Sequence, residues 1–246
     1  MLLAAIAALA GASCQAATGF GFALVLSPAL FAVLEPTEAV ATLLALGFAL
    51  SVLVLIEDGG HADWRRLAPM LLAALPGLVA GLVLLAALSK QALQIAVGVA
   101  VICAAGLQLS ARRARDGRPH RAELPGSAGI GAGFLSGALT TSISVSGPPI
   151  VLWLEAHGIG PSEFRASLAA SFFALNLMGW MMLIVAEGSP SVDAGVVAPL
   201  LAVVLVGYAL GTLVFRRLGR ERFFGIALAL VMCTGAASLA AGLSAL

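Results

Sequence analysis

Eight apolar segments occupy nearly the whole chain and strongly restrict what it can fold into. Six of them are about as long as the roughly 20 residues that a helix needs to cross a bilayer. Only 10% of the residues are charged, whereas soluble domains carry about 25%. Because lipid offers the backbone no hydrogen bonds, spanning segments of this length fold as helices. The sequence therefore predicts an all-α polytopic membrane protein that forms one integral domain without a soluble module.

Two of the eight segments, residues 2–34 and 126–157, are too long and too polar in the middle for a plain span. The second contains the run GFLSGALTTSISVSGPPIVLW, residues 133–153, with five hydroxyl residues in the seven positions before Gly-Pro-Pro. Since proline suits the first turn of a helix and breaks its interior, one helix is expected to end near Leu139 and another to begin at Pro148 or Pro149. Non-helical backbone at membrane depth persists only where protein or a water-filled cavity satisfies it, so the break predicts a binding site.

The two halves of the chain repeat in sequence. Residues 36–43, PTEAVATL, match residues 161–168, PSEFRASL, and each copy opens a helix with a proline, a hydroxyl and a glutamate. Further matches follow in the same order: Gly77-x3-Gly81 with Gly207-x3-Gly211, Leu88-Ser89-Lys90 with Leu218-Gly219-Arg220, and Cys103 with Cys233. The Gly-x3-Gly pairs suit close helix packing in lipid. These matches predict an internal duplication.

Each repeat is expected to consist of a broken, re-entrant helical hairpin followed by three transmembrane helices. The first repeat, residues 1–110, holds the hairpin 2–34 and helices 37–56, 67–88 and 91–110. A basic linker, residues 111–125, separates it from the second repeat, residues 126–246. That repeat holds the hairpin 126–157 and helices 162–186, 194–215 and 223–243.

The basic residues predict the orientation of these segments. If residues 126–157 enter and leave on one face, the loops at 57–66, 111–123, 158–165 and 216–222 share one side. Twelve of the thirteen Lys and Arg residues then lie on that side, and only Lys90 faces the other. By the positive-inside rule, the basic loops are cytoplasmic and both termini are periplasmic. Three spans separate the hairpins, so the second repeat is inverted relative to the first, an architecture typical of transporters.

The first residues, MLLAAIAALAGASC, have the apolar character of a signal peptide but lack a basic region before the apolar run. The duplication also requires this segment, so we expect it to remain in the mature protein. The three cysteines do not make an even disulfide framework and are interpreted as small buried hydrophobes.

The polar middles of the two hairpins contain no Lys, Arg, Asp, Glu or His. A helix N-terminus there carries free N–H groups and about half a positive charge, which suits a small oxyanion. A divalent metal would need carboxylates, so neither metal nor cofactor is expected. The candidate substrate-binding residues are Ser13, Gln15, Thr18, Gly19, Gly21, Thr140, Thr141, Ser142, Ser144, Ser146, Gly147 and, from the sixth segment, Asn176.

Two alternatives stay open for these residues. A hydroxyl in a helix often bonds only to the carbonyl one turn earlier, and this accounts for isolated serines such as Ser51. Asn176 either lines the pathway or joins two helices through a hydrogen bond.

The duplicated glycine-rich segments, residues 11–28 and 133–149, each precede a helix start, Ala41-Thr42 and Ala166-Ser167. In these features the chain resembles the sulfite exporter TauE/SafE family, also grouped with toluene-sulfonate uptake permeases, over nearly its whole length. It departs at Ser144-Val145-Ser146-Gly147-Pro148, where the family usually has more glycines. The resemblance implies secondary transport of sulfite, a sulfonate, sulfoacetate or a similar anion across a bacterial inner membrane. It leaves the direction open.

The sequence thus predicts a secondary transporter or facilitator for a small anion, working by alternating access within the lipid bilayer. A membrane scaffold or assembly factor is the alternative from another class, although it would not need two polar hairpins. An intramembrane enzyme is disfavoured because His61, His120 and His157 lie in or beside predicted loops. The net charge of +1 gives no reason to expect nucleic acid, and a homo-oligomer is left open.

Overall fold

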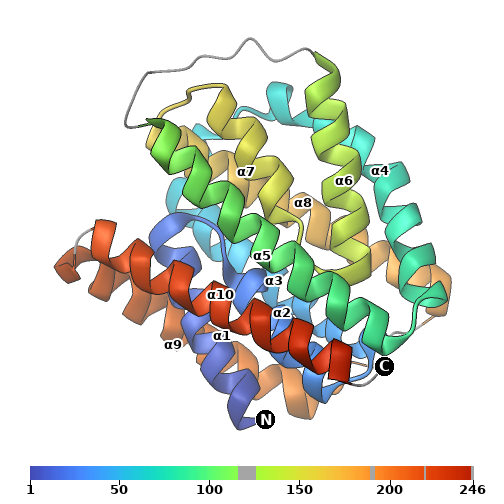
Figure 1. The fold of residues 1–246 in the computed structure, drawn as a ribbon. Coiled ribbons are helices and arrows are strands. Elements are labelled where there is room, and N and C mark those ends of the chain that lie inside the picture. The colour runs from blue at the N-terminus through green and yellow to red at the C-terminus, as the bar shows by residue number, and fades with distance from the viewer. Residues whose placement is uncertain (116–125, 189–191, 219, 245–246) are drawn as a thin grey trace.

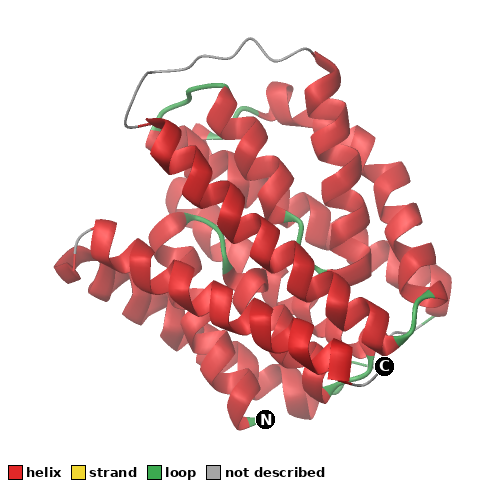
Figure 2. Cartoon of the chain, viewed as in Figure 1, coloured by secondary structure: helices red, strands yellow, loops and turns green. Residues whose placement is uncertain are grey.

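The computed structural model describes residues 1–115, 126–188, 192–218 and 220–244, and this part of the chain is helical without any strand (Figures 1 and 2). One 3-10 helix, Gly59–His61, joins two of the long helices. The α-helices are α1 (Leu2–Thr18), α2 (Phe22–Val33), α3 (Pro36–Asp58), α4 (Trp64–Ala87), α5 (Lys90–Arg115), α6 (Gly126–Ile143), α7 (Gly147–Ala156), α8 (Pro161–Glu187), α9 (Ala194–Leu218) and α10 (Arg220–Ser244).

The prediction of an all-α polytopic membrane protein is confirmed. Among the described residues, five helices are long and apolar enough to cross a membrane: residues 36–57, 64–87, 90–107, 161–186 and 194–213. The two helices of the first hairpin are shorter and equally apolar, as is the described apolar part of α10, residues 228–244. The chain is therefore a multi-pass membrane protein.

The helix boundaries agree with the expected ones within a few residues, with two exceptions. Helix α5 continues to Arg115, into the segment predicted as linker. Helix α6 continues to Ile143 and does not end near Leu139. The hydroxyls of Thr140 and Ser142 find hydrogen-bond partners inside α6, because they donate to the carbonyls of Ser136 and Ala138, each at 2.6 Å. The helix can therefore continue past Leu139.

Each hairpin is interrupted by a break of three residues, which we call the first break (residues 19–21) and the second break (residues 144–146). Gly19 and Gly21 have φ of 85° and 110°, a backbone region that glycine enters without steric cost. Ser144 has φ of 58° and is the only non-glycine residue with positive φ in the described chain. A side chain in this region costs about 1–2 kcal/mol, so the second break is held by its surroundings.

Glycines allow each hairpin to pack closely against a helix of the other half of the chain. Helix α6 lies along α4, and α1 lies along α9. A Cβ at Gly77 would overlap the carbonyl oxygen of Phe134, and one at Gly207 would lie 2.6 Å from the carbonyl oxygen of Leu9. The close packing predicted for the Gly-x3-Gly pairs is confirmed.

Other contacts also join the halves, and the most extensive are those of α3 with α8 and of α5 with α10. The start of α1 and the end of α10 lie in the lower half of Figure 1, whereas the end of α5 and the start of α6 lie at its top. The buried core is continuous from α1 and α2 through α3 to α5 and α9, and a second cluster fills the space between α4, α7 and α8. The two breaks therefore lie inside the protein.

Candidate functional site

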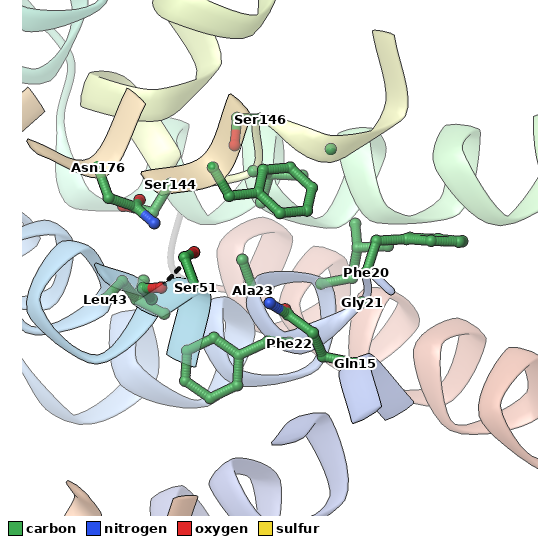
Figure 3. A pocket seen from close by; sticks show the side chains of 15 residues that line it. Gln15, Phe20, Gly21, Phe22, Ala23, Leu43, Ser51, Ser144, Ser146 and Asn176 are labelled. Atoms are coloured by element: carbon green, nitrogen blue, oxygen red, sulfur yellow. Dashed lines mark hydrogen bonds between the residues drawn. The ribbon is translucent and has the colours of Figure 1, made fainter. Parts of the chain in front are cut away.

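A cavity of about 40 Å³ lies where the two breaks meet (Figure 3). A water molecule needs about 10–15 Å³ of such space, so the cavity has room for a few waters or a small polar ligand. Helices α3 and α8 complete its wall between the breaks. The lining residues are Gln15, Phe20, Gly21, Phe22, Ala23, Leu24, Leu43, Gly47, Ser51, Ser144, Val145, Ser146, Gly147, Phe172 and Asn176.

Three polar side chains face this cavity without a hydrogen-bond partner in the described protein: Gln15, Ser146 and Asn176 (Figure 3). Gln15 is only 5% exposed and Ser146 only 8%. Buried polar groups are nearly always hydrogen-bonded, because an unpaired one costs about 1–3 kcal/mol. Donors left free around a cavity are therefore available to a ligand.

The amide of Asn176 fits against α3 because residue 47 is a glycine and has no side chain there. A Cβ at Gly47 would lie 2.9 Å from the amide nitrogen of Asn176. Asn176 makes no hydrogen bond to a neighbouring helix in the described chain, so the structure gives no support to its role as a link between helices.

Two helix N-termini open into the cavity. Helix α2 begins after Gly21, and its first backbone bond runs from Val25 N to Gly21 O at 3.2 Å. The N–H groups of Phe22, Ala23 and Leu24 therefore have no partner within the helix. Each N-terminus carries about half a positive charge.

The N-terminus of α7 is chemically different from that of α2. Pro148 and Pro149 follow Gly147 in its first turn and have no N–H to donate. The hydroxyl of Ser146 lines the cavity there, whereas that of Ser144, also in the wall, donates to the carbonyl of Thr140 at 3.3 Å. The first break thus supplies mainly backbone N–H donors, and the second supplies the side-chain hydroxyl of Ser146.

No Lys, Arg, His, Asp or Glu lies among the residues that line the cavity. Across the described residues, no group of three or more His, Cys, Asp or Glu side chains is placed to hold a metal ion. The cavity can therefore offer a ligand neutral donors, two helix N-termini and the aromatic rings of Phe20, Phe22 and Phe172.

Six of the twelve candidate residues line the cavity, and six do not. Those around it are Gln15, Gly21, Ser144, Ser146, Gly147 and Asn176; their binding role stays a prediction. Those outside it are Ser13, Thr18, Gly19, Thr140, Thr141 and Ser142. The hydroxyls outside it donate to backbone carbonyls, which is the structural alternative left open above.

Two of the hydroxyls outside the cavity attach the hairpins to the helices beside them. Thr141 donates to the carbonyl of Leu78 on α4 at 2.7 Å, and Ser13 donates to that of Gly207 on α9 at 2.8 Å. These bonds fix the position of each hairpin and so contribute indirectly to the shape of the cavity.

Sequence reasoning missed the contributions of α3, above all Gly47 and Ser51. The repeat predicted from the sequence contained the signal. Pro161 follows Pro36 by 125 residues (161 minus 36), and the same separation relates Ser51 to Asn176. It also relates Gly47 to Phe172, and all four residues line the cavity.

Each break is held by a side chain from the other half of the chain. Ser27 on α2 donates to the carbonyl of Ile143, the last residue of α6, at 2.9 Å. Arg165 on α8 donates through Nη1 to the carbonyl of Ala16 in α1 at 3.0 Å. Carbonyls in the last turn of a helix have no partner within it, so these bonds satisfy groups that the breaks leave exposed.

Replacing Ser27 by alanine is expected to lower the free energy of unfolding by about 1–3 kcal/mol, because the buried carbonyl of Ile143 loses its donor. Ser171→Ala is the matched control: Ser171 is equally buried, but its hydroxyl bonds only the carbonyl of Ser167 in its own helix. The apparent Tm of the purified variants in detergent measures both effects. Equal Tm values for the two variants would contradict the role assigned to Ser27.

Comparison with known proteins gives one family and one similar curated protein. A family profile described as "Sulfite exporter TauE/SafE" matches residues 3–239. A protein of Cupriavidus necator, "Probable sulfite/organosulfonate exporter TauE", is 31% identical over 172 residues, which cover 66% of this chain and 64% of that protein. The chain thus spans somewhat less than two thirds of the length of this relative. No solved structure matches the chain.

Proposed function

Since this chain belongs to the sulfite exporter TauE/SafE family, whose members are transporters and not enzymes, we propose that it moves a small sulfur-containing or organic anion across a bacterial inner membrane. Sulfite and small sulfonates are the first candidates, and export is the first candidate direction, because the relative carries both in its description. The observation that carries the proposal is the cavity between the two breaks, where unpartnered neutral donors converge.

The chemistry of the cavity favours an anion over other ligands. Gln15 and Asn176 present amide N–H groups, Ser146 presents a hydroxyl, and α2 presents backbone N–H groups. Helix N-termini bind oxyanions without a cationic side chain. A cation would meet two positive helix ends and no carboxylate, so the same cavity disfavours it.

The proposed mechanism is alternating access between two inverted repeats, residues 1–110 and 126–246, around this cavity. The helix contacts support it because they come in corresponding pairs: α1 with α9 and α6 with α4. The helices α3 and α8, which begin with the repeated proline motif, contact one another, as do α5 and α10. Residues separated by 125 positions, Gly47 with Phe172 and Ser51 with Asn176, line the same cavity, as a site between two repeats requires.

The proposed orientation places the basic loops in the cytoplasm and both termini in the periplasm. It rests on the distribution of Lys and Arg, because twelve of the thirteen share one side when each hairpin enters and leaves on the same face.

Ser146→Ala tests the site with the smallest possible change. A hydrogen bond to a charged group contributes about 1.5–3 kcal/mol, so loss of this hydroxyl should weaken anion binding roughly 10- to 100-fold. The measurement is the rise of the apparent Tm with sulfite or methanesulfonate concentration, since a ligand at about 100 times its Kd stabilises a protein by about 2.7 kcal/mol.

Thr212→Val is the control, because Thr212 lies on α9 and its hydroxyl donates at 3.0 Å to the carbonyl of Tyr208 in the same helix. The variant should keep the full Tm shift. A selective shift that Ser146→Ala leaves untouched would refute this site. No shift with any anion, in a protein that is folded, would favour a membrane scaffold.

A further inference from the structure

We propose that the cavity between the breaks selects singly charged oxyanions and rejects doubly charged ones. For sulfite this means that hydrogen sulfite, the protonated monoanion, is the transported form. The inference rests on the proposed function and adds to it the charge state of the substrate.

The wall of the cavity is electrically neutral. No lining residue carries a formal charge, and the polar side chains Gln15, Ser146 and Asn176 are neutral donors without a protein partner. Gln15 and Ser146 are more than nine-tenths buried and face the cavity (Figure 3). The residues in the cavity wall therefore act on a bound ion only through oriented dipoles.

The two helix N-termini set the size of this contribution. Each is equivalent to about half an elementary charge, so α2 and α7 together offset about one negative charge. A monoanion is thus nearly neutralised where it binds. A dianion keeps about one uncompensated charge in a cavity whose wall carries no formal charge.

Desolvation increases the difference between the two charge states. The energy required to remove an ion from water grows with the square of its charge, so it is about four times larger for a dianion of the same size. Arginine or lysine can recover this energy through charge-assisted hydrogen bonds. This cavity has neither, and it loses one more N–H donor at each of Pro148 and Pro149.

No ionisable group of the described residues joins the cavity wall. Arg165 contacts the first break: its guanidinium donates to the carbonyl of Ala16, and its Cγ packs against Gly19. The Cβ of Cys14 would lie 3.5 Å from a Cβ placed at Gly21. The described ionisable side chains on the elements that form the cavity are Cys14, Glu38, Glu57, Glu155, His157, Glu163 and Arg165, and none of them lines it.

The three anions that separate the possibilities differ in charge and little in size. Methanesulfonate is a monoanion, and sulfate a dianion, throughout the neutral range. Sulfite changes from monoanion to dianion near neutrality. If the monoanion is the substrate, transport of total sulfite falls as the pH rises, approaching roughly tenfold per pH unit once the dianion dominates.

The experiment measures flux of each anion into proteoliposomes holding the purified full chain, with equal pH inside and outside, between pH 6 and pH 8. The expected result is methanesulfonate flux that varies less than about twofold, sulfite flux that falls roughly tenfold, and sulfate flux at least about 100-fold below that of methanesulfonate. Gln15→Lys supplies the missing cation and should raise the sulfate-to-methanesulfonate flux ratio.

The outcomes separate the inference from the function on which it rests. Sulfite flux that rises with pH, or sulfate flux that equals methanesulfonate flux, would overturn the charge selection while leaving anion transport intact. A parallel fall of sulfite and methanesulfonate flux would assign the pH dependence to the protein and also overturn it. No flux of any of the three anions would overturn both proposals.

Discussion

Gln15→Glu is expected to reduce anion transport at least about 100-fold while leaving the protein folded. The substitution preserves the shape of the side chain and places a carboxylate in the wall of the cavity, where the substrate anion is proposed to bind. Two like charges about 4 Å apart repel each other by about 4 kcal/mol at the effective dielectric constant of a protein site. Protonation of the new carboxyl offsets part of this energy, and a remainder of about 2.7 kcal/mol corresponds to the expected 100-fold loss.

The control for this variant is the same change at another glutamine. Gln91 lies in the first turn of α5 and does not line the cavity. Gln91→Glu adds an identical charge at a helix N-terminus, where a carboxylate is favourable. Proteoliposome flux and apparent Tm are measured for both variants. Equal flux in Gln15→Glu, Gln91→Glu and the wild type would contradict the placement of the substrate beside Gln15.

Gly133→Ala is expected to lower the free energy of unfolding by about 3 kcal/mol or more, although it adds a single methyl group. A Cβ at Gly133 would overlap the backbone carbonyl oxygen of Met70 on α4. A carbonyl within a helix cannot turn aside as the end of a flexible side chain can, so α4 and α6 must separate along their contact. Overpacking of this kind costs about 1–3 kcal/mol or more.

Gly131→Ala, two residues earlier on α6, is the matched control. A Cβ at Gly131 has open space within 4 Å, and alanine favours a helix by up to about 1 kcal/mol over glycine. The apparent Tm should therefore fall by roughly 10 °C for Gly133→Ala and should not fall for Gly131→Ala. Equal Tm values for the two variants would show that α4 and α6 do not meet as closely as described.

Most of the fold could be predicted from the sequence, because a chain in lipid must hydrogen-bond its own backbone and does so mainly in helices. Apolar length predicted every long helix, and Pro36 and Pro161 predicted the starts of α3 and α8. The Gly-x3-Gly pairs predicted close packing but not the partners: only the structure shows that α4 packs on α6 and α9 on α1. Periodicity within one helix carries no information about which neighbour it meets.

The candidate site was predicted less completely, for a physical reason. A hydroxyl in a polar stretch bonds either a ligand or the carbonyl one turn earlier, and the sequence alone does not distinguish the two. Thr140 and Ser142 bond to carbonyls one turn earlier, and α6 continues through them. Ser146 lies beyond the end of α6 and faces the cavity. Glycine and serine on α3 gave no local signal, and only the repeat spacing links Ser51 to Asn176.

The backbone at the breaks connects the fold to the proposed function. Ser27 and Arg165 tie each break to the opposite half of the chain. A rocking motion of one repeat against the other would therefore move both breaks, together with the donors that they present to the cavity. This coupling is what alternating access around a single central site requires.

The central claim is that this chain carries a small anion through the cavity between the two breaks. Flux of radiolabelled sulfite into proteoliposomes that contain the purified protein tests it most directly, with Gln15→Glu and Gln91→Glu measured alongside. We predict saturable flux in the wild type and in Gln91→Glu, competition by unlabelled methanesulfonate, and a loss of at least about 100-fold in Gln15→Glu. Flux that persists in a folded Gln15→Glu variant, or its absence from the folded wild type, would contradict this claim.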